Sequence, residues 1–218
     1  ETNTTGSNNT AAGNGALQSN TTASGNTAFG RIALSANTTG ANNTGIGFCA
    51  LRTNTTAADN TSVGACSMCK NTTGHSNVAV GHCALFTNTE GDTNTAVGHH
   101  ALKLNTTAAD NTAVGRNALC TTTTGCVNTA MGSSAMQLNT TGDNNVAIGA
   151  GALYDNTTAD NNTAVGTNSL ANNTTAAANT AVGKNALFTT ITGAENTAVG
   201  VGALDVNTAS YNTAMGVD

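Results

Sequence analysis

Six cysteines and four histidines carry the most reactive side chains of this 218-residue chain, in which only 8% of residues are charged. Cys49, Cys66 and Cys83 recur with a 17-residue spacing, and Cys69 follows Cys66 by three positions. Stacked strands would bring such a column of cysteines to a Cα spacing of about 5 Å, which suits disulfides. A zinc site made by Cys66, Cys69, Cys83 and His82 is the alternative, because Cys-x-x-Cys spacing occurs in zinc sites.

A second pair of cysteines, Cys120 and Cys126, brackets a short glycine-containing turn within one repeat. Six cysteines in a chain of this composition favour disulfides over zinc. We therefore predict that most cysteines are oxidised, with the Cys120–Cys126 bridge and at least one bridge within the other four. The disulfide candidates are Cys49, Cys66, Cys69, Cys83, Cys120 and Cys126.

The histidines do not predict catalysis. His82 and His99 share the same 17-residue spacing, but no acid or serine recurs beside them to complete a catalytic set. An active site needs different side chains at one place, whereas this sequence repeats the same residues in columns. We expect an exposed histidine pair, no enzyme activity, no catalytic residue, no metal site and no cofactor.

The 17-residue spacing is the period of the whole sequence. The glycine of an Asn-Thr-Ala-Val-Gly phrase recurs at this spacing from Gly13 to Gly200, and the last step, to Gly216, is one position shorter. Numbered from its asparagine, the unit reads N-T-A-V-G-x-x-A-L-x-x-N-T-T-G-x-x. Residues 1–218 are therefore predicted to form one continuous repeat array without an internal boundary.

A 17-residue unit is too short for a helical hairpin, and its Gly, Asn and Thr content disfavours helix. Its two large apolar side chains, at the fourth and ninth positions, can be buried only if units stack at about 4.8 Å. We predict an all-β fold, a parallel β-solenoid (β-roll or β-helix) with one 17-residue repeat per coil and about 13 coils. The predicted core is the fourth and ninth columns, for example Val97, Val114, Leu102 and Leu119.

The polar columns have structural explanations. The first position is Asn in all thirteen copies and the twelfth is Asn in eleven. Stacked amides can hydrogen-bond along such a column while they tolerate turn conformations, and the fifth-position Gly is expected at a corner with positive φ. The predicted asparagine ladder contains Asn26, Asn43, Asn60, Asn77, Asn94, Asn111, Asn128, Asn145, Asn162, Asn179 and Asn196.

The third and eighth positions are almost always Ala. With the fourth position inside, the alternation of a strand turns the third outward. Uniformly small outward residues favour lateral packing of another surface against these alanine columns. The alternative is that the alanines occupy a tight inner corner.

The twelfth-position asparagines also begin Asn-x-Thr sequons, which glycosylating cells can modify. A net charge of −5 and scattered Lys and Arg do not predict a basic surface that would bind nucleic acid. No apolar run approaches the roughly 20 residues needed to span a membrane. The glycosylation candidates are Asn20, Asn37, Asn54, Asn71, Asn105, Asn139, Asn156 and Asn173.

The phrase Asn-Thr-Ala-Val-Gly-x-x-Ala-Leu, as at Asn94 to Leu102 and Asn179 to Leu187, resembles two groups of proteins. It resembles the Asn-Thr-Ala-Val-Gly arrays of surface and virus fibre proteins and, more distantly, the head repeats of trimeric autotransporter adhesins. The resemblance implies a left-handed parallel β-roll displayed on a cell or virion surface. The extra Asn-Thr-Thr-Gly arm makes this coil longer than the adhesin repeat.

These patterns lead us to expect a structural protein, the subunit of an extracellular fibre or filament. An adhesin or a virus or phage fibre shaft is the alternative. Ice binding ranks third, because it needs outward threonines at alternate positions, whereas the thirteenth and fourteenth threonines are adjacent. Glu1 enters the repeat at its tenth position and Asp218 leaves it at its seventh, so copies are predicted to self-associate by end-to-end stacking.

Overall fold

The computed structural model describes residues 2–217, which form short β-strands and turns. Within this described range no helix is present that could cross a membrane. The chain divides into two compact units, Glu1–Asp110 and Asn111–Asp218. Glu1 and Asp218, whose repeat phase underlies the end-to-end prediction, lie outside the described residues.

Each repeat contributes one three-residue strand, as the 17-residue period predicts. In the first unit the strands are β1 (Thr10–Ala12), β2 (Thr27–Phe29), β3 (Thr44–Ile46), β4 (Thr61–Val63), β5 (Val78–Val80) and β6 (Thr95–Val97). In the second unit they are β7 (Thr112–Val114), β8 (Thr129–Met131), β9 (Val146–Ile148), β10 (Thr163–Val165), β11 (Thr180–Val182), β12 (Thr197–Val199) and β13 (Thr213–Met215).

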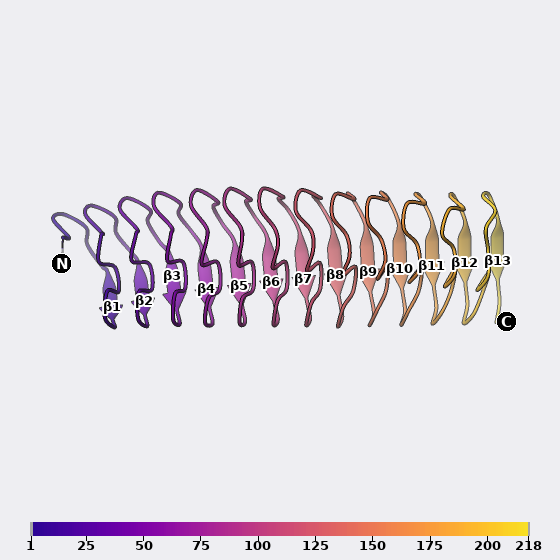
Figure 1. Ribbon diagram of the computed structural model, residues 1–218, viewed down its shortest axis with the longest axis horizontal. Helices are drawn as coiled ribbons and strands as arrows, with labels where there is room; N and C mark the ends of the chain where they lie inside the picture. The colour runs from indigo at the N-terminus through magenta and orange to yellow at the C-terminus, as the bar shows by residue number, and fades with distance from the viewer. Residues whose placement is uncertain (1, 218) are drawn as a thin grey trace. The chain divides into compact units, whose positions relative to one another are not determined.

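Within each unit every strand pairs in parallel with the strand of the next repeat (Figure 1). The register keeps identical repeat positions side by side, so Thr44 pairs with Thr61 and Ile46 with Val63. The turns continue this pairing from coil to coil. For example, the backbone N–H of Thr38 donates to the carbonyl oxygen of Thr55 at 2.9 Å. This arrangement confirms the predicted all-β parallel β-solenoid with one coil per repeat.

The ninth column forms the predicted core. Leu102 and Leu119 are fully buried. So are their counterparts in the other internal coils, where methionine replaces leucine at two positions. The fully buried members of the column are Leu34, Leu51, Met68, Leu85, Leu102, Leu119, Met136, Leu153, Leu170 and Leu187.

The prediction for the third and fourth columns was wrong. The fourth column faces outward, since Val97 and Val114 are only half-buried and Phe29 is 42% exposed. The third-column alanines, such as Ala96 and Ala113, are instead completely buried. Each strand has three residues, and its middle residue points inward, which leaves the second and fourth positions on the outer face.

Limited space inside the coil explains why the inner columns hold alanine. A Cβ added at Gly45, which occupies the third position of its repeat, would lie 3.2 Å from Cγ of Leu34. Alanine is therefore close to the largest residue that fits against the leucine column. The alanines occupy a tight inner position, so lateral packing between chains through the alanine columns is excluded by their burial within their own coils.

The coil turns depend on residues with positive φ. The fifth-position glycines have φ between 128° and 139°, as predicted for a glycine corner. The ninth-position leucines also have positive φ, for example 48° at Leu102 and 50° at Leu119. A non-glycine residue in this region costs about 1 kcal/mol or more. The fold retains this conformation because it directs each leucine side chain into the core.

Candidate functional site

The first-position asparagines link each coil to the next through side-chain amides. The Oδ1 atom of Asn26 accepts a hydrogen bond from the backbone N–H of Asn43 at 2.9 Å. Its Nδ2 donates to the carbonyl oxygen of Gly40 at 2.9 Å. Every member of the predicted ladder is fully buried. The asparagine ladder is confirmed, although it runs mainly from amide to backbone rather than from amide to amide.

The twelfth-position asparagines form the amide-to-amide ladder. Nδ2 of Asn37 donates to Oδ1 of Asn20 at 3.1 Å, and Nδ2 of Asn54 donates to Oδ1 of Asn37 at 2.9 Å. Each Nδ2 also donates to the carbonyl oxygen three residues later, as Asn54 does to Ala57. The column therefore closes the turn of its own coil and joins neighbouring coils.

This ladder changes the expectation for N-glycosylation. All eight candidates are buried, with at most 1% of Asn20 exposed, and in each the nitrogen that would carry a glycan donates hydrogen bonds. Glycosylation of the folded chain is not expected at these positions. Asn8, Asn42 and Asn161 also begin Asn-x-Thr sequons, and they are exposed. Their place at the seventeenth position of the repeat is the signal that distinguishes them.

Two copies replace the twelfth asparagine by threonine, and this interrupts the ladder. In the second unit, Oδ1 of Asn173 and Oγ1 of Thr190 are both buried without a hydrogen-bond partner. We expect Thr190→Asn to raise the free energy of unfolding by about 1–2 kcal/mol, because the new amide restores the missing donor to Asn173. Chemical denaturation followed by circular dichroism measures this change.

The matched control is Thr158→Asn, the same substitution at an exposed threonine of the same unit. This control should change the free energy of unfolding by no more than about 0.5 kcal/mol. Equal effects of the two substitutions would show that the ladder contributes no stability.

The cysteine column also forms as predicted. Cys49, Cys66 and Cys83 follow one another at the seventh position, and Cys69 interacts with Cys49 and Cys66. The structure thus brings four of the six disulfide candidates into one cluster. No disulfide is formed among the six cysteines, all of which lie in the described range. In the other pair, Sγ of Cys126 donates to the carbonyl oxygen of Thr124 at 3.3 Å. Oxidation of both groups stays a prediction.

Burial makes the clustered thiols hard to ionise. It raises the pKa of Cys69 to about 11 from an ordinary value of 9.0, with Arg52 opposing the shift and Cys49 and Cys66 adding to it. Burial, followed by repulsion from Cys66, also raises the pKa values of Cys49 and Cys83. Since the thiolate is the reactive form, we expect these three thiols to react slowly at neutral pH.

Alkylation tests this directly. We expect iodoacetamide to modify Cys69 slowly in the folded chain at pH 8, at a rate that rises with pH up to about 11. Peptide mass spectrometry after timed quenching gives the rate at each cysteine. In the urea-unfolded control the rate at Cys69 should follow the ordinary thiol pKa. Equal rates in folded and unfolded protein would contradict the burial argument.

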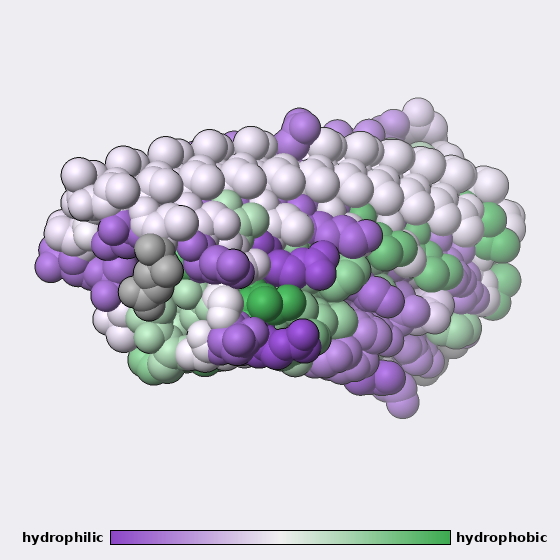
Figure 2. Space-filling view, turned by 60° about the vertical axis from the view of Figure 1, so that its left-hand side comes forward, coloured by the Kyte–Doolittle hydropathy of each residue, from purple (hydrophilic) through white to green (hydrophobic). Residues whose placement is uncertain are grey.

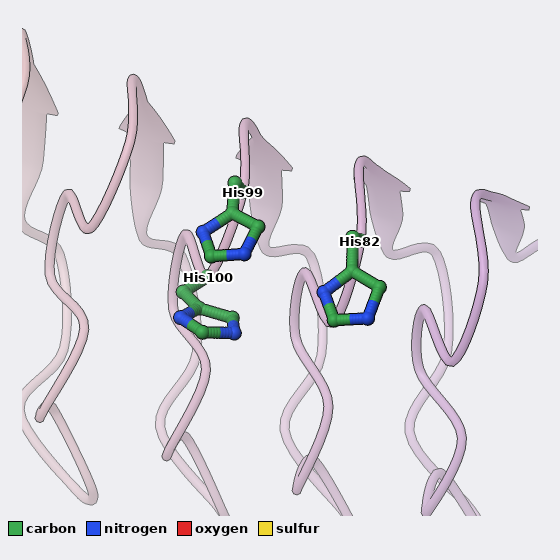
Figure 3. Close-up of side chains that lie close together, drawn as sticks. All are labelled: His82, His99 and His100. Carbon is green, nitrogen blue, oxygen red and sulfur yellow. The ribbon is translucent and has the colours of Figure 1, made fainter.

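Three imidazoles meet on neighbouring coils of the first unit. His82 and His99 occupy the sixth position of successive repeats, and their rings stack with centroids 5.3 Å apart (Figure 3). His100 lies 3.7 Å from His99 and 5.8 Å from His82, again between ring centroids. Burial, followed by repulsion from His99, Lys103 and His82, lowers the pKa of His100. The predicted pair is therefore part of a larger cluster.

The ligand atoms of the alternative zinc set, Cys66, Cys69, Cys83 and His82, do not all lie close enough to one another to share a metal ion. Among residues 2–217, the three histidines are the only group of three or more His, Cys, Asp or Glu side chains whose ligand atoms lie close enough to share a metal ion. Cys83 touches the edge of this group, with its Sγ 3.7 Å from Nε2 of His82.

No protein-family model, curated protein or solved structure matches the chain. Its function has to be inferred from its own coils and side chains.

Proposed function

We propose that the chain is a structural protein, the subunit of an extracellular fibre in which its coils stack on coils of the same sequence. One observation carries this proposal: the register places identical repeat positions side by side, as Thr44 beside Thr61 and Ile46 beside Val63, so each coil fits another coil of the same sequence. This stacking buries Ala28 completely, because it lies between Ala11 and Gly45 of the neighbouring coils.

The second unit shows the same stacking. Ala181 lies between Ala164 and Ala198, at the same repeat position, and is fully buried. The strand β11 pairs with β10 on one side and with β12 on the other, so each coil offers both of its faces to coils of the same sequence. An enzymatic role has no comparable support, because the repeat places like residues together in columns.

Electron microscopy of the purified chain tests the proposal. We expect filaments whose length grows with protein concentration and whose diffraction has an axial spacing of about 4.8 Å. Ala11→Arg, on the open face of the first coil, should shorten them, whereas the control Ala65→Arg, at an exposed outer position, should not. Short particles of one size at high concentration would contradict a fibre, and discrete rods bearing a knob would favour the adhesin or fibre-shaft alternative.

A second candidate function, ice binding, gains support from the outward face of the strands. The second column is Thr in eleven of thirteen copies and lies two residues before the outward fourth column. Each unit therefore carries parallel rows of hydroxyl and apolar side chains, with about 4.8 Å between coils and about 6.6 Å between the two rows. Regular rows of hydroxyl and apolar side chains can hold water in a lattice-like layer. Figure 2 shows that residues of similar hydropathy line up in rows on the face in view.

Thermal hysteresis distinguishes this function from the first. If the face binds ice, Thr163→Lys, in the middle of the threonine row of the second unit, should lower the hysteresis. Ala150→Lys is the control, because position 150 is exposed at the sixth column, where Lys184 occurs naturally. No hysteresis in the wild-type chain would eliminate ice binding and leave the fibre proposal untouched.

A further inference from the structure

Three of the four histidines of the chain lie in one cluster, which the repeat itself does not require. The sixth column holds many other residue types, including Arg31, Phe48 and Thr167. We propose that His82, His99 and His100 form a binding site for one divalent late transition-metal ion, of which Zn²⁺ is the representative.

The distances between the donor atoms suit such an ion. One ring nitrogen from each histidine lies within 4.8 Å of the other two. A zinc ion binds imidazole nitrogen at about 2.0–2.1 Å, so three tetrahedral ligands lie about 3.4 Å apart. His82 and His99 are exposed, and rotation of their side chains can close the remaining gap without repacking the core. The three donors thus already lie together on the surface before the ion binds.

The backbone holds the three rings on the same side of the coils. His82 follows β5 and His99 follows β6 at the same repeat position, so coil stacking alone aligns them (Figure 3). His100 has a φ of 60°, and its N–H donates to the carbonyl oxygen of His82 at 3.1 Å. This left-handed conformation turns consecutive side chains toward a common point, which an extended strand would direct to opposite faces.

The donor chemistry selects the class of metal. Imidazole nitrogen prefers zinc, copper and nickel, whereas calcium and magnesium prefer oxygen ligands. A fourth position is available to water or to the thiol of Cys83, whose Sγ lies 3.7 Å from Nε2 of His82. A bound ion would connect the coil of β5 to the coil of β6 by coordination bonds, in addition to their backbone hydrogen bonds.

Proton NMR of the full chain tests the proposal with Zn²⁺ itself as the probe. Four histidines give four imidazole Cε1–H resonances, few enough to assign by substitution. We expect one equivalent of Zn²⁺ to shift the three resonances of the cluster and to leave His75 unchanged. No saturable shift, or equal shifts of all four, would overturn the site.

Substitutions taken from the same repeat columns are expected to keep the fold intact. Asparagine occurs at the sixth position as Asn14 and at the seventh as Asn117, so His99→Asn and His100→Asn introduce residues that these turns already accommodate. Each should weaken Zn²⁺ binding by at least about tenfold in calorimetric titration. The control is His75→Ser, which copies Ser24 of the same column and should bind like wild type.

The competing explanation is that Zn²⁺ binds the clustered thiols, and cysteine variants distinguish the two sites. Zn²⁺ affinity that survives both histidine substitutions but falls in Cys66→Ser or Cys69→Ser would place the ion in the cysteine column and overturn the imidazole site. Unchanged affinity in the two cysteine variants, together with losses in the two histidine variants, supports it.

Discussion

Leu102→Ala is expected to lower the free energy of unfolding by about 2–5 kcal/mol, whereas Val97→Ala should cost less than about 1 kcal/mol. Leu102 is fully buried in the ninth column, and its truncation leaves a cavity between the alanine columns of its coil. Val97, five residues earlier, is half-buried on the outer face of β6. Because each coil contacts only its neighbours, the loss should spread from the coil of β6 through the first unit.

Guanidinium denaturation of the two variants, followed by circular dichroism, provides the comparison. A charge in place of the leucine, as in Leu102→Asp, should have a larger effect than alanine because the carboxylate would be buried without a partner. If Leu102→Ala and Val97→Ala lower the free energy of unfolding equally, the fourth-column valines belong to the core, as hydropathy predicts, and the alanines do not point inward.

The period of the sequence determines much of this fold. A 17-residue recurrence of Asn, Gly and a ninth-position Leu or Met permits one coil per repeat, and stacking then follows because a single coil cannot bury that apolar side chain. The parallel pairing, the leucine core, the asparagine ladder and the glycine corner were all predictable on this basis. Each depends only on which residues recur together.

The inward and outward faces were not predictable in the same way. Strand alternation allows either the third or the fourth column to face inward, and hydropathy favours valine over alanine. The deciding factor is the diameter of the coil, which leaves room for little more than a methyl group opposite Leu34 and its equivalents. That diameter depends on the positive φ of the leucines, and leucine gives no sequence signal of this conformation.

The histidine cluster could also be predicted only in part from the sequence. The 17-residue spacing places His82 beside His99, but it does not predict that His100 joins them. The missing fact is the left-handed conformation of the seventh position, which turns His100 toward the pair. A signal was present, since several repeats carry residues there that tolerate this conformation, namely Gly15, Gly151, Gly202, Asn117, Asn168 and Asn185.

Gly166→Ala should destabilise the second unit by about 3 kcal/mol or more. Gly166 has a φ of 133°, a conformation that side chains resist. An added Cβ would lie 2.6 Å from both the carbonyl carbon and the oxygen of Gly183 in the next coil. These are backbone atoms held by the stack, so the clash can be relieved only by separating the two coils, with loss of their hydrogen bonds.

The control is Gly151→Asn in the same unit. Gly151 has a φ of 65°, and Asn168 and Asn185 adopt similar values at the same repeat position. The nearest atom to a new Cβ is the amide oxygen of Asn168, the end of a side chain that can move. Its unfolding free energy should therefore remain within about 0.5 kcal/mol of wild type. If thermal and chemical denaturation show Gly166→Ala to be as stable as this control, the contact between glycine corners of successive coils is looser than the structure indicates.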